Sequence, residues 1–122
     1  MKELLLVFVG GGLGSSLRYW IAILINSQGI KWIPTLSVNV MGCLLLGLII
    51  GLWHRENISE TWFLLLGIGF CGGLTTFSTF GAELFQLLKA GDIAQASGYL
   101  VASIVLGTLV LSISYFGVQR LI

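Results

Sequence analysis

Long apolar runs separated by short polar stretches dominate the hydrophobic pattern of this chain. A helix needs about 20 mostly apolar residues to cross the hydrocarbon core of a bilayer. Four segments satisfy this requirement, at residues 4–25, 35–53, 62–88 and 96–119. The stretches between them are short, at residues 26–34, 54–61 and 89–95. The pattern therefore predicts one all-α integral membrane domain over residues 1–122, built from four transmembrane helices.

The composition of the chain favours lipid over water. Charged residues make up only 9% of the sequence, against roughly 25% in a typical soluble domain. All four tryptophans lie near predicted helix ends, where interfacial aromatic residues concentrate. The net charge of +1 offers no basic surface for nucleic acid. Cys43 and Cys71 fall within apolar segments, and we interpret both as reduced packing residues.

Lysine and arginine are almost evenly divided between the two sides of the predicted bundle. Four helices place both termini on one side, which holds three such residues, Lys2, Arg55 and Arg120. The opposite side holds Lys31 and Lys89, and Arg18 lies inside the first segment nearer to that side. Orientation normally follows this loop bias. Its near absence favours insertion in both orientations and an antiparallel homodimer, while a single orientation set by other features stays the alternative.

Glycines and intramembrane polar residues stand out within the segments. Gly47 and Gly51 form a GxxxG pair, and residues 10–14 read GGGLG; such small residues favour close helix packing. Arg18, Asn39 and Glu83 lie in the same half of the bundle, and ionisable residues inside a span are candidate functional residues. One interpretation is an Arg18–Glu83 ion pair, or an arginine reaching toward the interface. The other is a polar vestibule that admits a charged solute.

The third segment contains the run Gly69–Phe80, in which paired glycines precede hydroxyls and two phenylalanines. The ten residues from Trp62 to Cys71 span about 15 Å of helix, half of a core about 30 Å thick. We therefore expect the helix to open at Gly72-Gly73 near the midplane, with freed carbonyls suited to a cation. Phe77 and Phe80 share a face, and their positive ring edges suit a small dehydrated anion. The alternative is that the phenylalanines pack and the threonines bond the backbone.

Hydroxyls of the fourth segment fall on two faces. Tyr99, Ser103 and Ser114 share one face, and the opposite face carries Thr108, Ser112 and Tyr115. Such hydroxyls often bond their own helix backbone, and they could equally line a pore. The pattern alone leaves both interpretations open.

Three motifs resemble those of the small fluoride channels called Fluc or CrcB. They are GGGLGSSLRYW in the first segment, VNVMG in the second and GFCGGLTTFSTF in the third. The resemblance covers the whole chain, with its four spans and overall length. It implies an antiparallel, dual-topology homodimer in the cell membrane, with two pores that release fluoride passively and select it over chloride.

The resemblance also implies roles for single residues. Backbone carbonyls of Gly72 and Thr75 would hold a structural sodium ion at the dimer centre. The fluoride path would be lined by Asn39, Phe77, Ser78, Thr79, Phe80, Tyr99 and Ser103. Arg18 and Glu83 would belong to a charged vestibule. Gly107 departs from the family's pattern, because a hydroxyl would be expected at that spacing after Ser103.

We therefore predict a fluoride-selective channel that acts without enzymatic chemistry, since no HExxH motif, nucleophile elbow or paired catalytic acid occurs. One alternative is a small multidrug-type exporter of cations, also with four short spans and dual topology. Such an exporter needs a membrane-embedded acid, and the first segment has none after Glu3. A second alternative is a non-conducting membrane assembly subunit.

Overall fold

The computed structural model describes residues 1–25 and 29–121, and every regular element in these ranges is a helix. The elements are α1 (Lys2–Leu24), α2 (Ile33–His54), α3 (Glu60–Trp62), the π-helix η1 (Phe63–Cys71), α4 (Gly72–Leu74), α5 (Phe77–Lys89) and α6 (Ile93–Leu121). Four stretches are long and apolar enough to cross a membrane, namely α1, α2, the run Glu60–Lys89 and α6. The four predicted segments are therefore confirmed, with ends that agree within a few residues. The predicted connection 26–34 lies partly outside the described residues.

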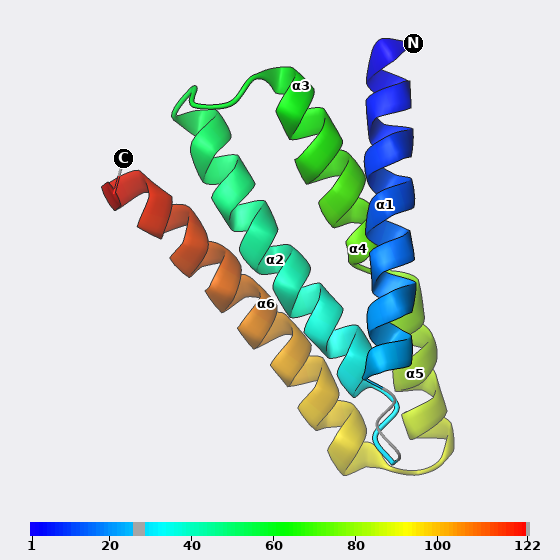
Figure 1. Cartoon of the computed structure of the whole chain (residues 1–122). Helices are drawn as coiled ribbons and strands as arrows, with labels where there is room; N and C mark the ends of the chain where they lie inside the picture. Colours follow the sequence, from blue (N-terminus) through cyan, green and yellow to red (C-terminus); the bar gives the residue numbers. More distant parts are fainter. Residues whose placement is uncertain (26–28, 122) are drawn as a thin grey trace.

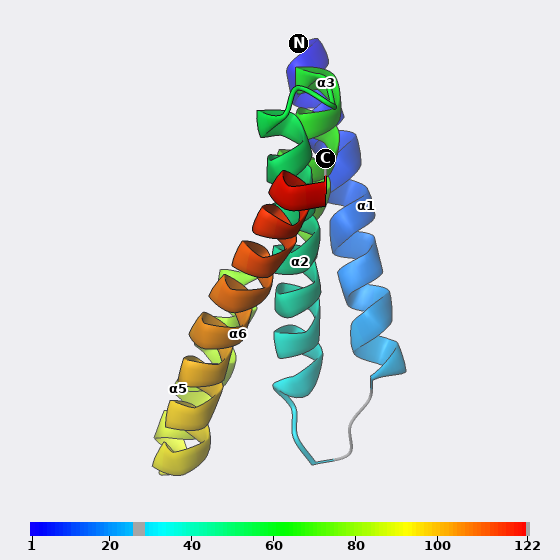
Figure 2. The same ribbon diagram turned by 90° about the vertical axis from the view of Figure 1, so that its left-hand side faces the viewer.

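Helix α2 lies in the middle of the arrangement. It packs along α6 and η1, while α1 packs along η1 and α4. Helix α1 begins and α6 ends toward the upper part of Figure 1, as expected for four passes. In Figure 2, α5 and α6 lean to one side of α2, and α1 lies on the other side. Side chains of α2 can therefore meet both the third helical run and α6.

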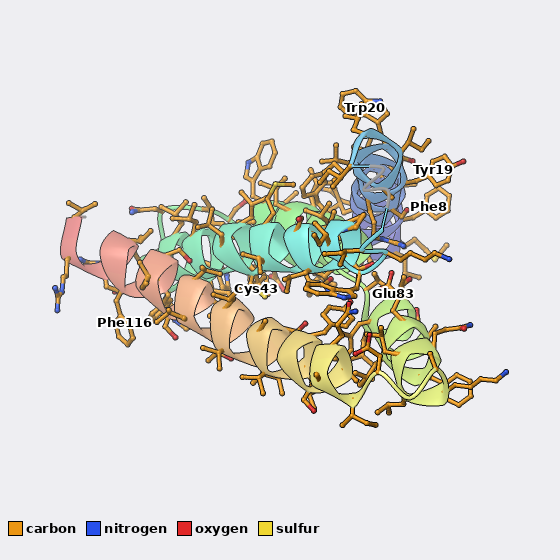
Figure 3. The ribbon with its side chains drawn as sticks, turned by 90° about the horizontal axis from the view of Figure 1, so that it is seen from below. Phe8, Tyr19, Trp20, Cys43, Glu83 and Phe116 are labelled. Atoms are coloured by element: carbon orange, nitrogen blue, oxygen red, sulfur yellow. The ribbon has the colours of Figure 1, made fainter. Side chains whose placement is uncertain are left out.

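Large apolar side chains cover the outside of the helices. Phe8, Tyr19, Trp20 and Phe116 project away from the ribbon in Figure 3, and all four are well exposed. The largest fully buried side chains among the described residues are Val38, Leu74, Cys71 and Tyr99. An apolar exterior around a small interior suits a lipid environment, where helix association relies on packing and hydrogen bonds.

Glycines let two pairs of helices approach at backbone distance. A Cβ atom added at Gly10 or Gly14 of α1 would collide with carbonyl oxygens of η1. In the second pair, Gly47 faces Ser114 of α6, and a Cβ atom there would collide with the serine hydroxyl. Helix packing is thus confirmed as the use of both predicted glycine groups. The contacts are made within one chain.

The third helical run changes backbone conformation beyond the paired glycines. Gly72 and Gly73 are helical in α4, so the expectation that the helix opens at this pair is wrong. A side chain at Gly73 would collide with the backbone of Gly11, so this glycine serves close packing instead. The extended residues are Thr75 (φ −84°, ψ 155°) and Thr76 (φ −148°, ψ 118°), and α5 begins at Phe77.

Candidate functional site

Two extended threonines interrupt the helical hydrogen bonding beyond α4. The Thr75 amide still makes the helical bond to the Cys71 carbonyl oxygen, at 3.0 Å, and the Thr75 hydroxyl donates to the same oxygen at 2.9 Å. The Gly73 carbonyl accepts a bond of 3.1 Å from Nε of Arg18. In lipid every such group must be satisfied by the protein. Arg18 of α1 therefore closes the end of α4.

Asn39 of α2 holds the second extended residue. Its Nδ2 donates to the Thr76 carbonyl oxygen at 3.2 Å, and its Oδ1 accepts from the Thr76 amide at 2.7 Å. The Thr76 hydroxyl in turn accepts from the Thr79 amide at 3.1 Å, which makes it the N-cap of α5. The hydroxyls of Ser78 and Thr79 both lie within hydrogen-bond distance of the Thr76 hydroxyl. Asn39 thus orients the start of α5.

A pocket of about 320 Å³, which we call the Phe77 pocket, opens beside the extended residues. It is lined by Asn39, Gly42, Cys43, Leu46, Thr75, Thr76, Phe77, Phe80, Ser103 and Ile104. Phe77 is 84% exposed and Phe80 only 8%, with ring centroids 5.8 Å apart. The buried Ser103 hydroxyl has no hydrogen-bond partner among the described residues. The structure thus brings five predicted residues together: Asn39, Thr75, Phe77, Phe80 and Ser103.

Glu83 of α5 is held by two hydroxyls. Its carboxyl oxygens accept bonds of 2.8 Å from Thr35 and 2.7 Å from Tyr99. The ring of Tyr99 is fully buried and packs edge-on against Phe80, with centroids 5.0 Å apart. No ion pair joins Arg18 and Glu83 in the described part of the chain, so the ion-pair half of that interpretation is wrong, and an arginine that reaches toward the interface stays a prediction. Each group finds an uncharged partner instead.

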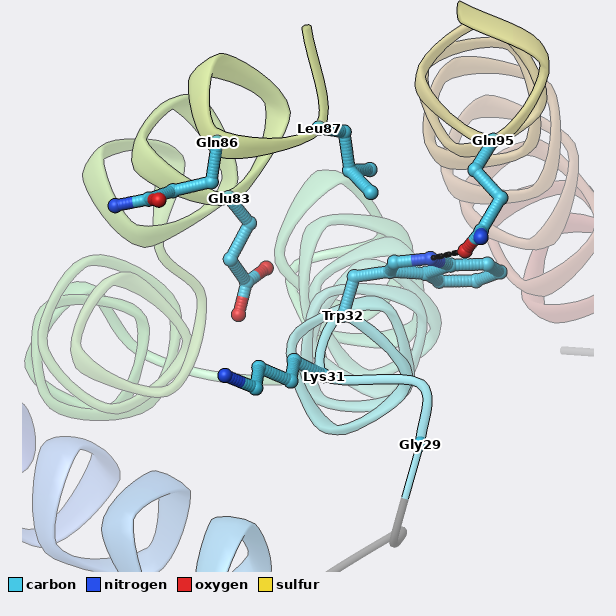
Figure 4. A pocket seen from close by; sticks show the side chains of 7 residues that line it. All are labelled: Gly29, Lys31, Trp32, Glu83, Gln86, Leu87 and Gln95. Atoms are coloured by element: carbon cyan, nitrogen blue, oxygen red, sulfur yellow. Dashed lines mark hydrogen bonds between the residues drawn. The ribbon is translucent and has the colours of Figure 1, made fainter. Parts of the chain in front are cut away.

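Glu83 also borders a larger pocket, of about 410 Å³, shown in Figure 4. The lining side chains are mostly polar or charged and include Lys31, Trp32, Gln86 and Gln95. Trp32 donates from Nε1 to Gln95 at 3.1 Å and stacks on Tyr99 at 4.9 Å. Arg18 lines a separate pocket of about 120 Å³ together with Thr35, Thr76 and Thr79. The vestibule role of Arg18 and Glu83 stays a prediction.

Comparison with known proteins places this chain in a family. Residues 5–117 match the family model described as "CrcB-like protein, Camphor Resistance (CrcB)". The chain belongs to the CrcB family. A relative from Phocaeicola vulgatus, named fluoride-specific ion channel FluC, is 49% identical over 89% of this chain and 92% of its own length. Relatives of the same name from Bacteroides fragilis and Methylobacillus flagellatus are 42% and 38% identical, each covering more than nine tenths of both chains.

Membership of the CrcB family agrees with the four helices, and the chain is a multi-pass membrane protein. The hydroxyls of α6 separate into two kinds within this CrcB chain. Ser112 and Ser114 donate to carbonyl oxygens of their own helix, at 2.8 and 3.0 Å, so they follow the backbone-bonding interpretation. Tyr99 donates to Glu83, and Ser103 faces the Phe77 pocket. Of these four residues, only Tyr99 and Ser103, which were predicted to line the path, do not bond their own helix backbone.

The two residues proposed for sodium in this CrcB chain differ in exposure, since Gly72 is exposed and Thr75 is half-buried. Nothing in the described residues lies within 4 Å of a Cβ atom built at Gly72. Backbone oxygens are hard ligands of the kind that alkali cations accept. No group of three acidic, cysteine or histidine side chains occurs in the described residues. A sodium site here would therefore rest on backbone oxygens, and it stays a prediction.

Sequence reasoning missed Thr35 and Thr76. The role of Thr76 could have been predicted locally, because threonine is a preferred N-cap residue and Thr76 directly precedes α5. Thr35 has none, since its bond to Glu83 joins residues 48 positions apart.

Proposed function

We propose that this chain forms a fluoride-selective channel that conducts fluoride passively out of the cell. The names of its relatives in the CrcB family support this function. The observation that carries it structurally is the buried, unpartnered Ser103 hydroxyl in the Phe77 pocket. A buried donor without an acceptor costs about 1–3 kcal/mol. A dehydrated anion that accepts this bond in transit removes that cost.

The lining of the Phe77 pocket suits a small anion better than a cation. Aromatic rings carry positive charge at their edges, and Phe77 and Phe80 come from adjacent turns of α5. The side chains around them are neutral, comprising amide, hydroxyl, thiol and apolar groups. A cation exporter would need a carboxylate facing its substrate. The one carboxylate of α5, Glu83, already accepts two hydroxyl bonds.

The functional unit in this proposal is an antiparallel homodimer in the cell membrane. A single chain leaves the Phe77 ring 84% exposed, and a second copy would cover it and close the pore wall. Charge balance across the loops gives no fixed orientation. Carbonyls of Gly72 and Thr75 from both copies would hold the structural sodium ion at the dimer centre. That ion would link the copies and neutralise the clustered carbonyl dipoles.

Fluoride efflux from liposomes tests this function. The purified protein should release fluoride without coupling to protons and should release chloride far more slowly. Phe77→Ile and Phe80→Ile should each lower fluoride efflux by tenfold or more, because aliphatic side chains have no positive edge. Size-exclusion profiles serve as the control for folding.

Three outcomes contradict the proposal. Proton-coupled movement of an organic cation, without fluoride efflux, would indicate the exporter. Absence of any efflux from well-folded protein would favour the non-conducting assembly subunit. Wild-type efflux from both isoleucine variants would also contradict the proposal, because the phenylalanine rings would then not be part of the pore.

A further inference from the structure

One face of α6 carries hydroxyls at two successive turns and none at the third. Tyr99, Ser103 and Gly107 are four residues apart, so they lie along the same side of the helix. Gly107 is buried against α2. Sγ of Cys43 borders the place where its side chain would stand, because it lies 3.4 Å from the position of a Cβ atom at residue 107, at van der Waals contact. In Figure 3 the Cys43 side chain lies between α2 and α6.

Cys43 reaches the same pocket as the unpartnered serine. It lines the Phe77 pocket together with Asn39, one helical turn before it on α2, and with Ser103. Its thiol is free and partly exposed. The second cysteine, Cys71, is buried in η1 and does not line this pocket. Cys43 therefore adds a thiol to a pocket that already holds one hydroxyl donor without a partner.

We propose that Cys43 supplies, from α2, the hydrogen-bond donor that Gly107 does not supply from α6. A thiol donates weakly, yet a small anion without its water shell gains from any donor in an otherwise apolar wall. Cys43 would then determine how well fluoride crosses the segment beyond Ser103. This inference rests on the proposed channel function and adds one residue to its path.

The opposing explanation is packing alone. Cysteine behaves as a small apolar residue in most buried positions, and Gly107 leaves room for its sulfur. The two explanations differ in what replaces the thiol. Alanine and serine are nearly equal in volume, and both are smaller than cysteine, but only serine keeps a donor.

Four variants measured by fluoride efflux from liposomes separate the explanations. Cys43→Ala should lower efflux by about threefold, and Cys43→Ser should match or exceed the wild type. Adding Gly107→Ser to Cys43→Ala should restore efflux, because it returns a hydroxyl to the α6 face where the sulfur stood. The matched control is Ser112→Ala, whose hydroxyl bonds its own helix and lies outside the Phe77 pocket. That control should conduct like the wild type.

The result is interpretable only against a conducting wild type, which separates this test from the test of channel function. Wild-type efflux in Cys43→Ala overturns the inference, and so does an equal loss in Cys43→Ala and Cys43→Ser. A double variant no better than Cys43→Ala overturns the claim that the thiol takes the place of residue 107. An equal loss in Ser112→Ala would show a general sensitivity to such substitutions and also overturn it.

Discussion

The two halves of the third helical run are held in opposite ways. The first half, Phe63–Leu74, has no charged residue and packs against α1 through glycine–backbone contacts. The second half, Phe77–Lys89, is positioned by side-chain hydrogen bonds from Asn39, Thr35 and Tyr99. These close contacts allow almost no movement of the helices, because a backbone oxygen cannot change rotamer to make room as a side chain can. Polar contacts specify direction and leave space, which is why the three pockets described above lie beside the second half or its first turn.

The largest expected effect comes from disturbing the packed half. Gly14→Ala should destabilise the protein by about 3 kcal/mol, the upper end of typical overpacking costs, since its Cβ atom collides with the Phe70 carbonyl oxygen. Thermal unfolding in detergent measures the change. Gly12→Ala is the matched control on the same helix, because nothing lies within 4 Å of a Cβ atom there. Equal unfolding of the two variants would refute the contrast between the halves.

A smaller effect on stability and a larger one on conduction should follow from Asn39→Ala. The substitution leaves the amide and carbonyl of Thr76 unpaired, at about 1–3 kcal/mol for a buried polar group. We expect fluoride efflux to fall by tenfold or more, because the start of α5 loses its orientation. Ser37→Ala on the same helix is the control, since its hydroxyl bonds only Ile33 of its own helix. Retained efflux in Asn39→Ala would show that the hydrogen bonds do not position the site.

The smallest effect should come from Tyr99→Phe. It removes one hydrogen bond to Glu83 but keeps the ring against Phe80, so we expect a loss of about 1 kcal/mol and about threefold lower efflux. The exposed contact of Tyr115 with His54 offers a comparison. Tyr115→Phe should change stability by no more than about 0.5 kcal/mol. An equal loss of stability in Tyr99→Phe and Tyr115→Phe would contradict the expectation that the more buried hydroxyl contributes more.

Much of the fold was predictable from local pattern. Long apolar runs specify helices that cross a membrane, because only closed backbone hydrogen bonding is tolerated in lipid. The role of glycine in close packing was also visible in the sequence. The helices that the glycines contact were not visible, because the GxxxG pair could have faced another chain and instead faces α6. The position of the extended residues was mispredicted, because Gly73 is required for contact with Gly11.

The amino-acid pattern was enough to specify the helices, the family and the set of polar residues placed in the membrane. Which of these residues meet depends on how the helices pack together. Glu83 binds Thr35 and Tyr99 rather than Arg18, and the sulfur of Cys43 lies against Gly107. The physical reason is that helix formation depends on neighbours within one or two turns. The partner of a polar side chain depends on how helices distant in sequence are stacked, which no local pattern records.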